Sequence, residues 1–125
     1  MKVALRGVMQ ALKKNEFVAM LADQDAHEIG TFVNFFGRPA STPKGPAAFA
    51  LRADCPMIFS IIIRKNDKFI AKFETVPKPA SIGDEEKDIQ NYTQVYTTML
   101  ENYCREYPEN WFWLHRRWKT KQTLI

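Results

Sequence analysis

The densest group of chemically active side chains in the chain follows a short apolar run that ends at Ala22. This group consists of Asp23, Gln24, Asp25, His27 and Glu28. Carboxylates beside an imidazole are the groups that perform general acid–base catalysis. In open α/β sheets, ligands gather outside the carboxyl ends of strands, so the position suits a functional site. Aspartates also cap turns after strands, and on position alone this simpler interpretation stays open.

The side chains of Asp23, Asp25 and His27 are also of the types that ligate metal ions. The stretch does not match a calcium loop, because Glu28 stands where glycine is needed and Asn34 where the bidentate glutamate belongs. The sequence contains no GxSxG, GxxxxGK[ST] or GxGxxG motif. We therefore expect no metal site and no cofactor.

The hydrophobic periodicity predicts the elements that position this acidic stretch. Apolar residues at helical spacing predict an amphipathic helix over residues 2–14, with Asn15 as a left-handed stop. Residues 17–22 are continuously apolar, which predicts an inner strand covered on both faces, as in parallel sheets. A second extended segment is expected over residues 31–36, broken by the Gly37-Arg38-Pro39 sequence.

The remaining residues predict a helix, a hairpin and a long helix, in that order. Thr42-Pro43 reads as the N-cap of a helix that continues through Arg52. Strands over residues 57–64 and 69–75 flank an Asn66-Asp67 turn, and residues 81–84 offer caps for a helix that Pro108 ends. We predict the α/β class, with a partial layered sheet and flanking helices in a single domain over residues 1–125.

Composition and charge narrow the classes of protein. Of the 125 residues, 46% are hydrophobic, enough for a packed core, and the net charge of +4 favours an anionic partner. Cys55 and Cys104 fit no metal or disulfide pattern, so we expect reduced thiols. The sequence shows no signal peptide and no apolar run of the ~20 residues that a membrane-spanning helix needs.

Three stretches together resemble a known family. The Asp23-Gln24-Asp25 stretch precedes FVNFFGRPAST (residues 32–42) and GPA (residues 45–47), and the chain closes on YPENWFWLHRRWK (residues 107–119). In this order and spacing, the stretches resemble the C-terminal part of the late acyltransferases of lipid A biosynthesis, the bacterial lauroyl/myristoyl transferase family. The resemblance covers nearly the whole chain.

The resemblance implies an enzyme at the cytoplasmic face of the bacterial inner membrane, with this chain as a peripheral part. The enzyme would move a fatty acyl group from acyl carrier protein or acyl-CoA to a hydroxyl of a lipid A precursor. The expected fold is the C-terminal half of the glycerolipid-acyltransferase-like fold. In that family a histidine, followed five positions later by an acid, takes the proton of the acceptor hydroxyl.

The chain departs from the family at this catalytic pair. Phe32 follows His27 by five positions and Thr120 follows His115, so neither histidine has its acid. The family's N-terminal membrane anchor is also not recognised. We therefore expect a fragment without activity of its own. Asp23 and Asp25 would support the active site, and the predicted substrate-binding residues are Gln24, Arg38, Thr42, His115, Arg116, Arg117 and Lys119.

Several alternatives remain open. A non-catalytic, peripheral lipid- or protein-binding module is the second hypothesis for the whole chain. The lysines and arginine of the first helix, Lys2, Arg6, Lys13 and Lys14, could form a solvated face or dock the acidic carrier protein. The tryptophans at 111, 113 and 118 could sit at a membrane surface or pack on the core. Nucleic acid is not an expected partner, because the basic residues of the tail fit no known binding module.

Overall fold

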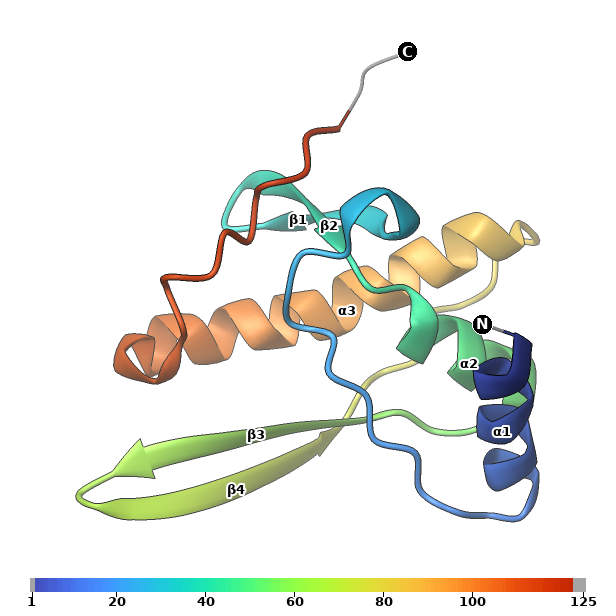
Figure 1. Ribbon diagram of the computed structural model, residues 1–125, viewed down its shortest axis with the longest axis horizontal. Coiled ribbons are helices and arrows are strands. Elements are labelled where there is room, and N and C mark those ends of the chain that lie inside the picture. The colour runs from blue at the N-terminus through green and yellow to red at the C-terminus, as the bar shows by residue number, and fades with distance from the viewer. Residues whose placement is uncertain (1, 123–125) are drawn as a thin grey trace.

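A long helix organises the molecule, as the computed structural model shows over residues 2–122 (Figure 1). This helix, α3 (Glu85–Glu106), has one β-hairpin on each side. The first hairpin comprises β1 (Thr31–Phe35) and β2 (Arg38–Thr42), and the second comprises β3 (Ile58–Lys65) and β4 (Lys68–Thr75). Helices α1 (Lys2–Lys13) and α2 (Gly45–Ala53) lie together at one end. Two 3₁₀ turns, η1 (His27–Ile29) and η2 (Pro108–Asn110), complete the described elements.

The predicted inner strand at residues 17–22 is wrong. This segment has no regular secondary structure, and the side chains of Phe17 and Leu21 are 100% and 96% exposed. An apolar run becomes an inner strand only where neighbouring strands are available on both sides, and the described residues offer no such sheet. Val18, Met20 and Ala22 are partly buried, and Ala22 packs against the core.

The break predicted at Gly37-Arg38-Pro39 is confirmed at Gly37 but not at Arg38 and Pro39, which lie in β2. Phe36 and Gly37 both have positive φ, 53° and 74°, so these two residues form a tight hairpin turn and the chain continues into β2 at Arg38. The strands pair antiparallel from Thr31 opposite Thr42 to Phe35 opposite Arg38. Thr42 therefore belongs to β2 and is not the predicted N-cap; α2 begins two residues after Pro43, with Lys44 as its N-cap.

The ends of α1 and α3 follow the sequence prediction. Asn15 adopts a left-handed conformation with φ of 61°, and the N–H of Glu16 bonds to the carbonyl of Ala11, which closes α1 in a Schellman motif. At α3 the carboxylate of Asp84 accepts the N–H of Lys87. The helix ends directly before Tyr107-Pro108, because proline has no N–H to donate to the next turn.

The β3–β4 hairpin is also confirmed. Asn66 and Asp67 have φ of 50° and 58°, the conformation of a two-residue type I′ turn, and the strands pair from Ile58 opposite Thr75 to Lys65 opposite Lys68.

The buried face of α3 holds two small hydrophobic clusters together. Near its N-terminal half, Ile89, Tyr92 and Tyr96 pack against α2. Near its C-terminal half, Leu100 and Cys104 pack against Phe35 and Ala40 of the β1–β2 hairpin. The helix thereby fixes that hairpin and the segments that lie over it.

The structure is mixed α/β, as predicted, but its two sheets are separate antiparallel hairpins, not one layered sheet. The likeness to the C-terminal half of a glycerolipid-acyltransferase-like fold stays a prediction. Across residues 2–122, no helix is both long and apolar enough to cross a membrane.

Candidate functional site

The acidic loop at residues 23–27, strand β2 and the C-terminal tail converge at one place. The N–H of Ala26 bonds to the carbonyl of Ser41 at 3.2 Å, and the hydroxyl of Ser41 donates to the carbonyl of His27 at 2.6 Å. Gly30 allows this close approach, because a Cβ at this position would lie 2.3 Å from Ser41 Oγ and 2.9 Å from the carbonyl oxygen of Thr42. The loop is therefore held against β2 by hydrogen bonds and close backbone packing.

Asp25 lies at the centre of this junction, with only 1% of its side chain exposed. Its carboxylate accepts the hydroxyl of Thr120 at 2.7 Å, the N–H of Thr120 at 3.2 Å and the N–H of His27 at 3.0 Å. Burial alone would raise the pKa of Asp25, but these hydrogen bonds outweigh it and hold the pKa below its usual range. Asp25 is therefore a buried carboxylate that ties the tail to the acidic loop.

His115 joins the same junction from the tail. Its Nε2 accepts the backbone N–H of Asp25 at 2.9 Å, so this nitrogen carries no proton in the structure. With Nε2 occupied in this way, His115 is not free to accept a proton from a substrate. The sequence predicted that His115 binds substrate; its observed contact is with the backbone of the acidic loop.

Arg117 is a second buried charged residue at the junction, with 1% exposed. Its guanidinium donates to the carbonyl of Ser41 at 2.7 Å and to the hydroxyl of Thr42, and it lies 5.3 Å above the ring of Phe35. Burial lowers the pKa of Arg117, and the carboxylates of Asp25 and Asp23 act in the opposite direction. Arg117 therefore joins the tail to β2 in the interior, away from the solvent in which a substrate would arrive.

Asp23 lies near the interior without a comparable set of bonds. Burial raises the pKa of Cys104 to about 11, and the carboxylates of Glu101 and Asp23 add to this increase. Asp23 thus contributes negative charge to both Cys104 and Arg117. The Asp23 and Asp25 carboxylates together balance the buried guanidinium without a direct ion pair to it within the described residues.

The predicted substrate-binding residues fall into two groups. Three of them, Thr42, His115 and Arg117, have their polar groups engaged inside the junction. The other four lie exposed on the surface: Gln24, Arg38, Arg116 and Lys119. Arg38 stacks over the ring of Trp118 at 4.8 Å, and the indole N–H of Trp118 donates to the carbonyl of Phe35. Three of the four exposed residues, Arg38, Arg116 and Lys119, carry positive charge.

The tryptophans of the tail divide in the same way. Trp111 and Trp118 pack on Phe35, with ring centroids 5.9 and 5.6 Å apart. Trp113 is about half exposed and follows Phe112 and precedes Leu114, which are both exposed. Packing on the core is thus confirmed for Trp111 and Trp118, and a membrane-surface role of Trp113 stays a prediction.

The position of His27 argues against a histidine–acid pair in the junction. Its Nδ1 lies 3.6 Å from Asp25 Oδ1, which is too long for a hydrogen bond, and the imidazole is mostly exposed. Within residues 2–122 no three or more His, Cys, Asp or Glu side chains gather as a metal site.

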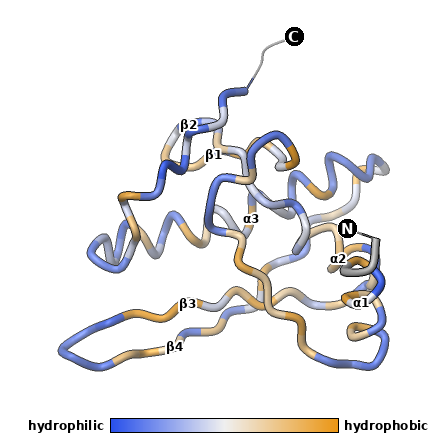
Figure 2. Tube along the Cα trace, viewed as in Figure 1, coloured by the Kyte–Doolittle hydropathy of each residue, from blue (hydrophilic) through white to orange (hydrophobic). Residues whose placement is uncertain are grey.

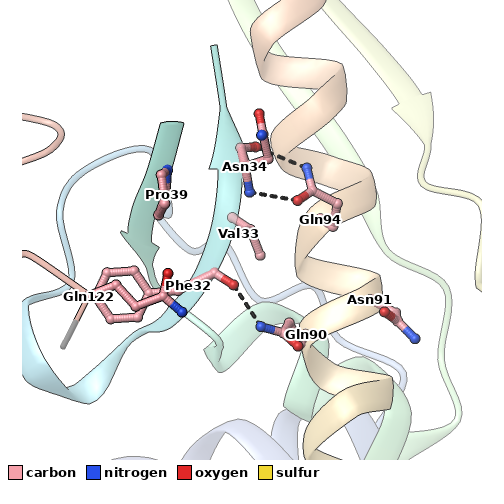
Figure 3. A pocket seen from close by; sticks show the side chains of 8 residues that line it. All are labelled: Phe32, Val33, Asn34, Pro39, Gln90, Asn91, Gln94 and Gln122. Atoms are coloured by element: carbon pink, nitrogen blue, oxygen red, sulfur yellow. Dashed lines mark hydrogen bonds between the residues drawn. The ribbon is translucent and has the colours of Figure 1, made fainter. Parts of the chain in front are cut away.

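A shallow groove lies on the other side of the β1–β2 hairpin, between β1 and α3 (Figure 3). It has a volume of about 270 Å³ and is lined mainly by amides and apolar groups. Gln94 bonds to both the N–H and the carbonyl of Asn34, and Gln90 donates to the carbonyl of Phe32. The glutamine side chains thus bond to the backbone edge of β1 at which a neighbouring strand would otherwise pair. The described residues that line the groove include no acid, histidine or cysteine.

Sequence reasoning missed two participants in the junction. Thr120, which bonds to Asp25 across 95 residues of sequence, carried no signal that could have identified it. Ser41 was part of a quoted stretch but received no role. Gly30 did carry a signal, since an isolated glycine at the start of a strand marks a close backbone approach.

Comparisons with known proteins agree with the resemblance in the sequence. The family model of the bacterial lipid A biosynthesis acyltransferase matches residues 1–120. The chain is 29% identical over 119 residues to the lipid A biosynthesis palmitoleoyltransferase of Escherichia coli K12 and, equally, to a lipid A biosynthesis acyltransferase of Shigella flexneri. The alignment covers 94% of this chain and 38% of each relative, so the chain spans well under half of the length of these relatives.

Proposed function

We propose that this chain, which belongs to the bacterial lipid A biosynthesis acyltransferase family, supplies the part of an acyltransferase that supports the active site and meets the acceptor. The enzyme would move a fatty acyl group from acyl carrier protein or acyl-CoA to a hydroxyl of a lipid A precursor. The observation that carries this proposal is the buried junction of Asp25, Thr120 and Arg117, because it joins the stretches on which the family resemblance rests.

The proposed reaction needs a general base. The oxygen of the acceptor hydroxyl attacks the carbonyl carbon of the thioester while an imidazole takes the hydroxyl proton. The carbon–sulfur bond then breaks and the thiolate leaves and takes up a proton, so an ester and a free thiol are formed without a covalent enzyme intermediate. A carboxylate that holds the imidazole keeps the accepting nitrogen aimed at the hydroxyl.

The histidines of this chain are poorly placed for that role. His115 uses Nε2 within the junction, and His27 is too far from Asp25 for the carboxylate to orient it. The base would therefore come from the part of the enzyme that this chain does not span. We expect the chain alone to be inactive.

The exposed basic residues beside the junction suit an anionic acceptor. Arg116 is exposed, and its guanidinium can hold two phosphate oxygens at once, as lysine cannot. Arg38 and Lys119 add positive charge, and Gln24 offers an amide at the edge of the acidic loop. Arg117 and Thr42 would act as positioning residues, because their polar groups are engaged inside the protein.

A membrane surface is the natural place for a lipid acceptor. The exposed side chains of Phe112, Trp113 and Leu114 would enter the headgroup region, with Arg116 close by for anionic lipid. This arrangement supports a peripheral position at the cytoplasmic face of the inner membrane.

A transfer assay tests the proposal. A chimaera carries residues 1–120 of this chain in place of the matched segment of the Escherichia coli palmitoleoyltransferase, and both it and the free chain receive acyl carrier protein thioester and lipid A precursor. We expect acylated product, identified by mass spectrometry, from the chimaera and only background from the free chain. General-base catalysis commonly contributes ~100- to 10,000-fold, so the difference should be large.

The alternative function is a non-catalytic, peripheral lipid- or protein-binding module, which the exposed Phe112-Trp113-Leu114 stretch would also fit. This alternative would be favoured if the chimaera folded but transferred no acyl group while the free chain still bound anionic vesicles. Turnover by the free chain that disappears on changing His27 would contradict the assignment of the base to another part of the enzyme.

A further inference from the structure

The β3–β4 hairpin presents an apolar face that nothing in residues 2–122 covers. Alternate residues of the two strands point to this face, and its four large apolar residues are Ile58, Ile62, Phe69 and Phe73. Their exposed fractions are 46%, 65%, 75% and 70%. Ser60, Ala71 and Thr75 lie on the same face, and Arg64 lies at its end beside the turn, where it pairs with Asp67. Figure 2 shows apolar colouring in both strands and a hydrophilic tip at the turn. Soluble monomers rarely leave a continuous apolar surface of this kind uncovered.

The opposite face of the hairpin is the one that packs on α3. Phe59 stacks on Tyr103 with ring centroids 5.6 Å apart, and Ile63 is 1% exposed. Lys72 lies over the rings of Tyr103 and Tyr107, at 5.3 and 5.2 Å. The hairpin is thus a sheet with one face buried in this chain and the other free.

The outer edge of β4 is also open, whereas Asn110 caps the outer edge of β3 at Arg64. The N–H of Arg64 points away from β4 and donates to Asn110 Oδ1 at 2.7 Å. In an antiparallel pair the direction of the backbone groups alternates, so the N–H and C=O of Phe69, Ala71 and Phe73 point to the outer edge of β4. Among the described residues these groups have no hydrogen-bond partner. An uncapped edge of this kind is a template for a further strand.

The exposed area of the whole chain is large for its size. It amounts to 9100 Å², whereas a compact monomer of 14.5 kDa exposes about 6,900 Å². The excess of about 2,200 Å² exceeds the ~800 Å² that each partner contributes to a standard interface.

We propose that the free face of β3–β4 and the outer edge of β4 are the docking surface for the remaining part of an acyltransferase domain, the part of the relatives that this chain does not span. The inference rests on the proposed function, because the occupant is identified by the family. The relatives contain 62% of their length beyond the aligned segment, which is enough polypeptide to cover the face and extend the sheet. A strand from that part would pair with β4, and its apolar side chains would cover Ile62 and Phe73.

A polypeptide fits this surface better than a lipid does. Acyl chains could cover the apolar side chains, but they cannot bond to the open N–H and C=O groups of β4, and leaving such groups unpaired in an apolar environment is costly. A second copy of this chain could pair edge to edge, yet it would supply only another hairpin. It would not supply the part of the relatives that lies outside the alignment.

Co-expression tests the docking. The part of the Escherichia coli palmitoleoyltransferase outside the alignment is produced as a separate polypeptide with residues 1–125 of this chain, and the complex is captured in detergent through a tag on this chain. We expect capture, and at least tenfold slower hydrogen exchange at the amides of Phe69, Ala71 and Phe73 in the complex than in the free chain. Ile62→Lys and Phe73→Lys should abolish capture, because lysine on a face or edge opposes pairing.

A matched control separates docking from general effects of the substitutions. Ile82→Lys changes a residue of similar exposure, 61%, outside the hairpin, and it should leave capture unchanged. All three variants should unfold at the same urea concentration as the free chain, since the replaced side chains are mostly exposed.

The outcomes also separate this inference from the proposed function. Capture without acyl transfer in the complex and in the chimaera would uphold the docking surface and overturn the proposed function. The docking surface would be overturned if capture failed or if Ile82→Lys reduced capture as much as the hairpin variants do. It would also be overturned if β4 became protected in a dimer of this chain or by vesicles alone. Transfer by the chimaera would still leave the proposed function standing in those cases.

Discussion

Replacement of Arg117 should destabilise the chain far more than replacement of its neighbour Arg116. In Arg117→Ala, the carbonyl of Ser41 and the hydroxyl of Thr42 lose a charged donor, and such bonds contribute roughly 1.5–3 kcal/mol each. The substitution also removes a buried charge, which returns part of this energy. We therefore expect a net loss of about 2–4 kcal/mol in the free energy of unfolding, a large fraction of the ~5–15 kcal/mol typical of a domain.

Urea unfolding of residues 1–125, followed by tryptophan fluorescence, measures this loss. Arg116 is exposed, so Arg116→Ala should stay within about 0.5 kcal/mol of the parent. A double-mutant cycle with Thr42→Val should give a coupling of about 0.5–3 kcal/mol, since the two side chains are in contact. A loss below about 1 kcal/mol in Arg117→Ala, or equal losses at 116 and 117, would refute the buried junction as the structure describes it.

Four further predictions follow from the same contacts. The hydrogen bonds that lower the pKa of Asp25 stabilise the fold at pH values above 3.8, the ordinary pKa of this carboxyl, and this contribution is lost as the pH falls through the lowered pKa. The urea midpoint between pH 3 and 6 should therefore depend less on pH in Asp25→Asn than in the parent. Gly30→Ala should cost about 1–3 kcal/mol in the same assay, because the added Cβ would meet Ser41 and Thr42, whereas Gly7→Ala, where the added Cβ has open space, should not destabilise. Cys104 should react with iodoacetamide much more slowly than Cys55 at pH 8, since its thiol is buried and its pKa is raised to about 11; equal labelling by mass spectrometry would contradict this. Lys13→Glu with Lys14→Glu in the chimaera should raise the KM for the carrier-bound donor at low salt if α1 docks the acidic carrier protein, and an unchanged KM would leave these exposed lysines as a solvated face. The side chain of Lys2 lies outside the described part of α1.

The elements that local sequence determines were predictable. Asn15, Asp84 and Pro108 mark helix ends through properties of their own backbone or side chains, and Asn66-Asp67 forms a turn because both residues tolerate positive φ. Apolar residues at helical spacing along α3 lie on its buried face, among them Ile89, Tyr92, Tyr96 and Tyr103.

Elements that depend on distant partners were not predictable in the same way. The apolar segment 17–22 reads as an inner strand, but a strand needs neighbours, and the local sequence does not say whether they are present. Pro39 suggested that the break continues past Gly37, yet proline is tolerated in an edge position, and the turn comprises only Phe36 and Gly37.

The candidate site was located by its residues but not by its geometry. The sequence singled out Asp25 and Arg117 as functional, and the structure brings them to one junction. Adjacent residues in the sequence gave no hint that Arg116 would be exposed and Arg117 buried. That division depends on which side chain meets Ser41 and Thr42, a contact across 75 residues of sequence.

The most direct test of the account is the effect of Asp23→Asn on acyl transfer by the chimaera. The amide keeps the shape of the carboxylate and removes the charge that faces Arg117 and Cys104. If this junction supports an acyltransferase active site, kcat/KM should fall at least tenfold, about 1.4 kcal/mol in activation free energy, while the fold stays in place. A kcat/KM within twofold of the parent would contradict the account.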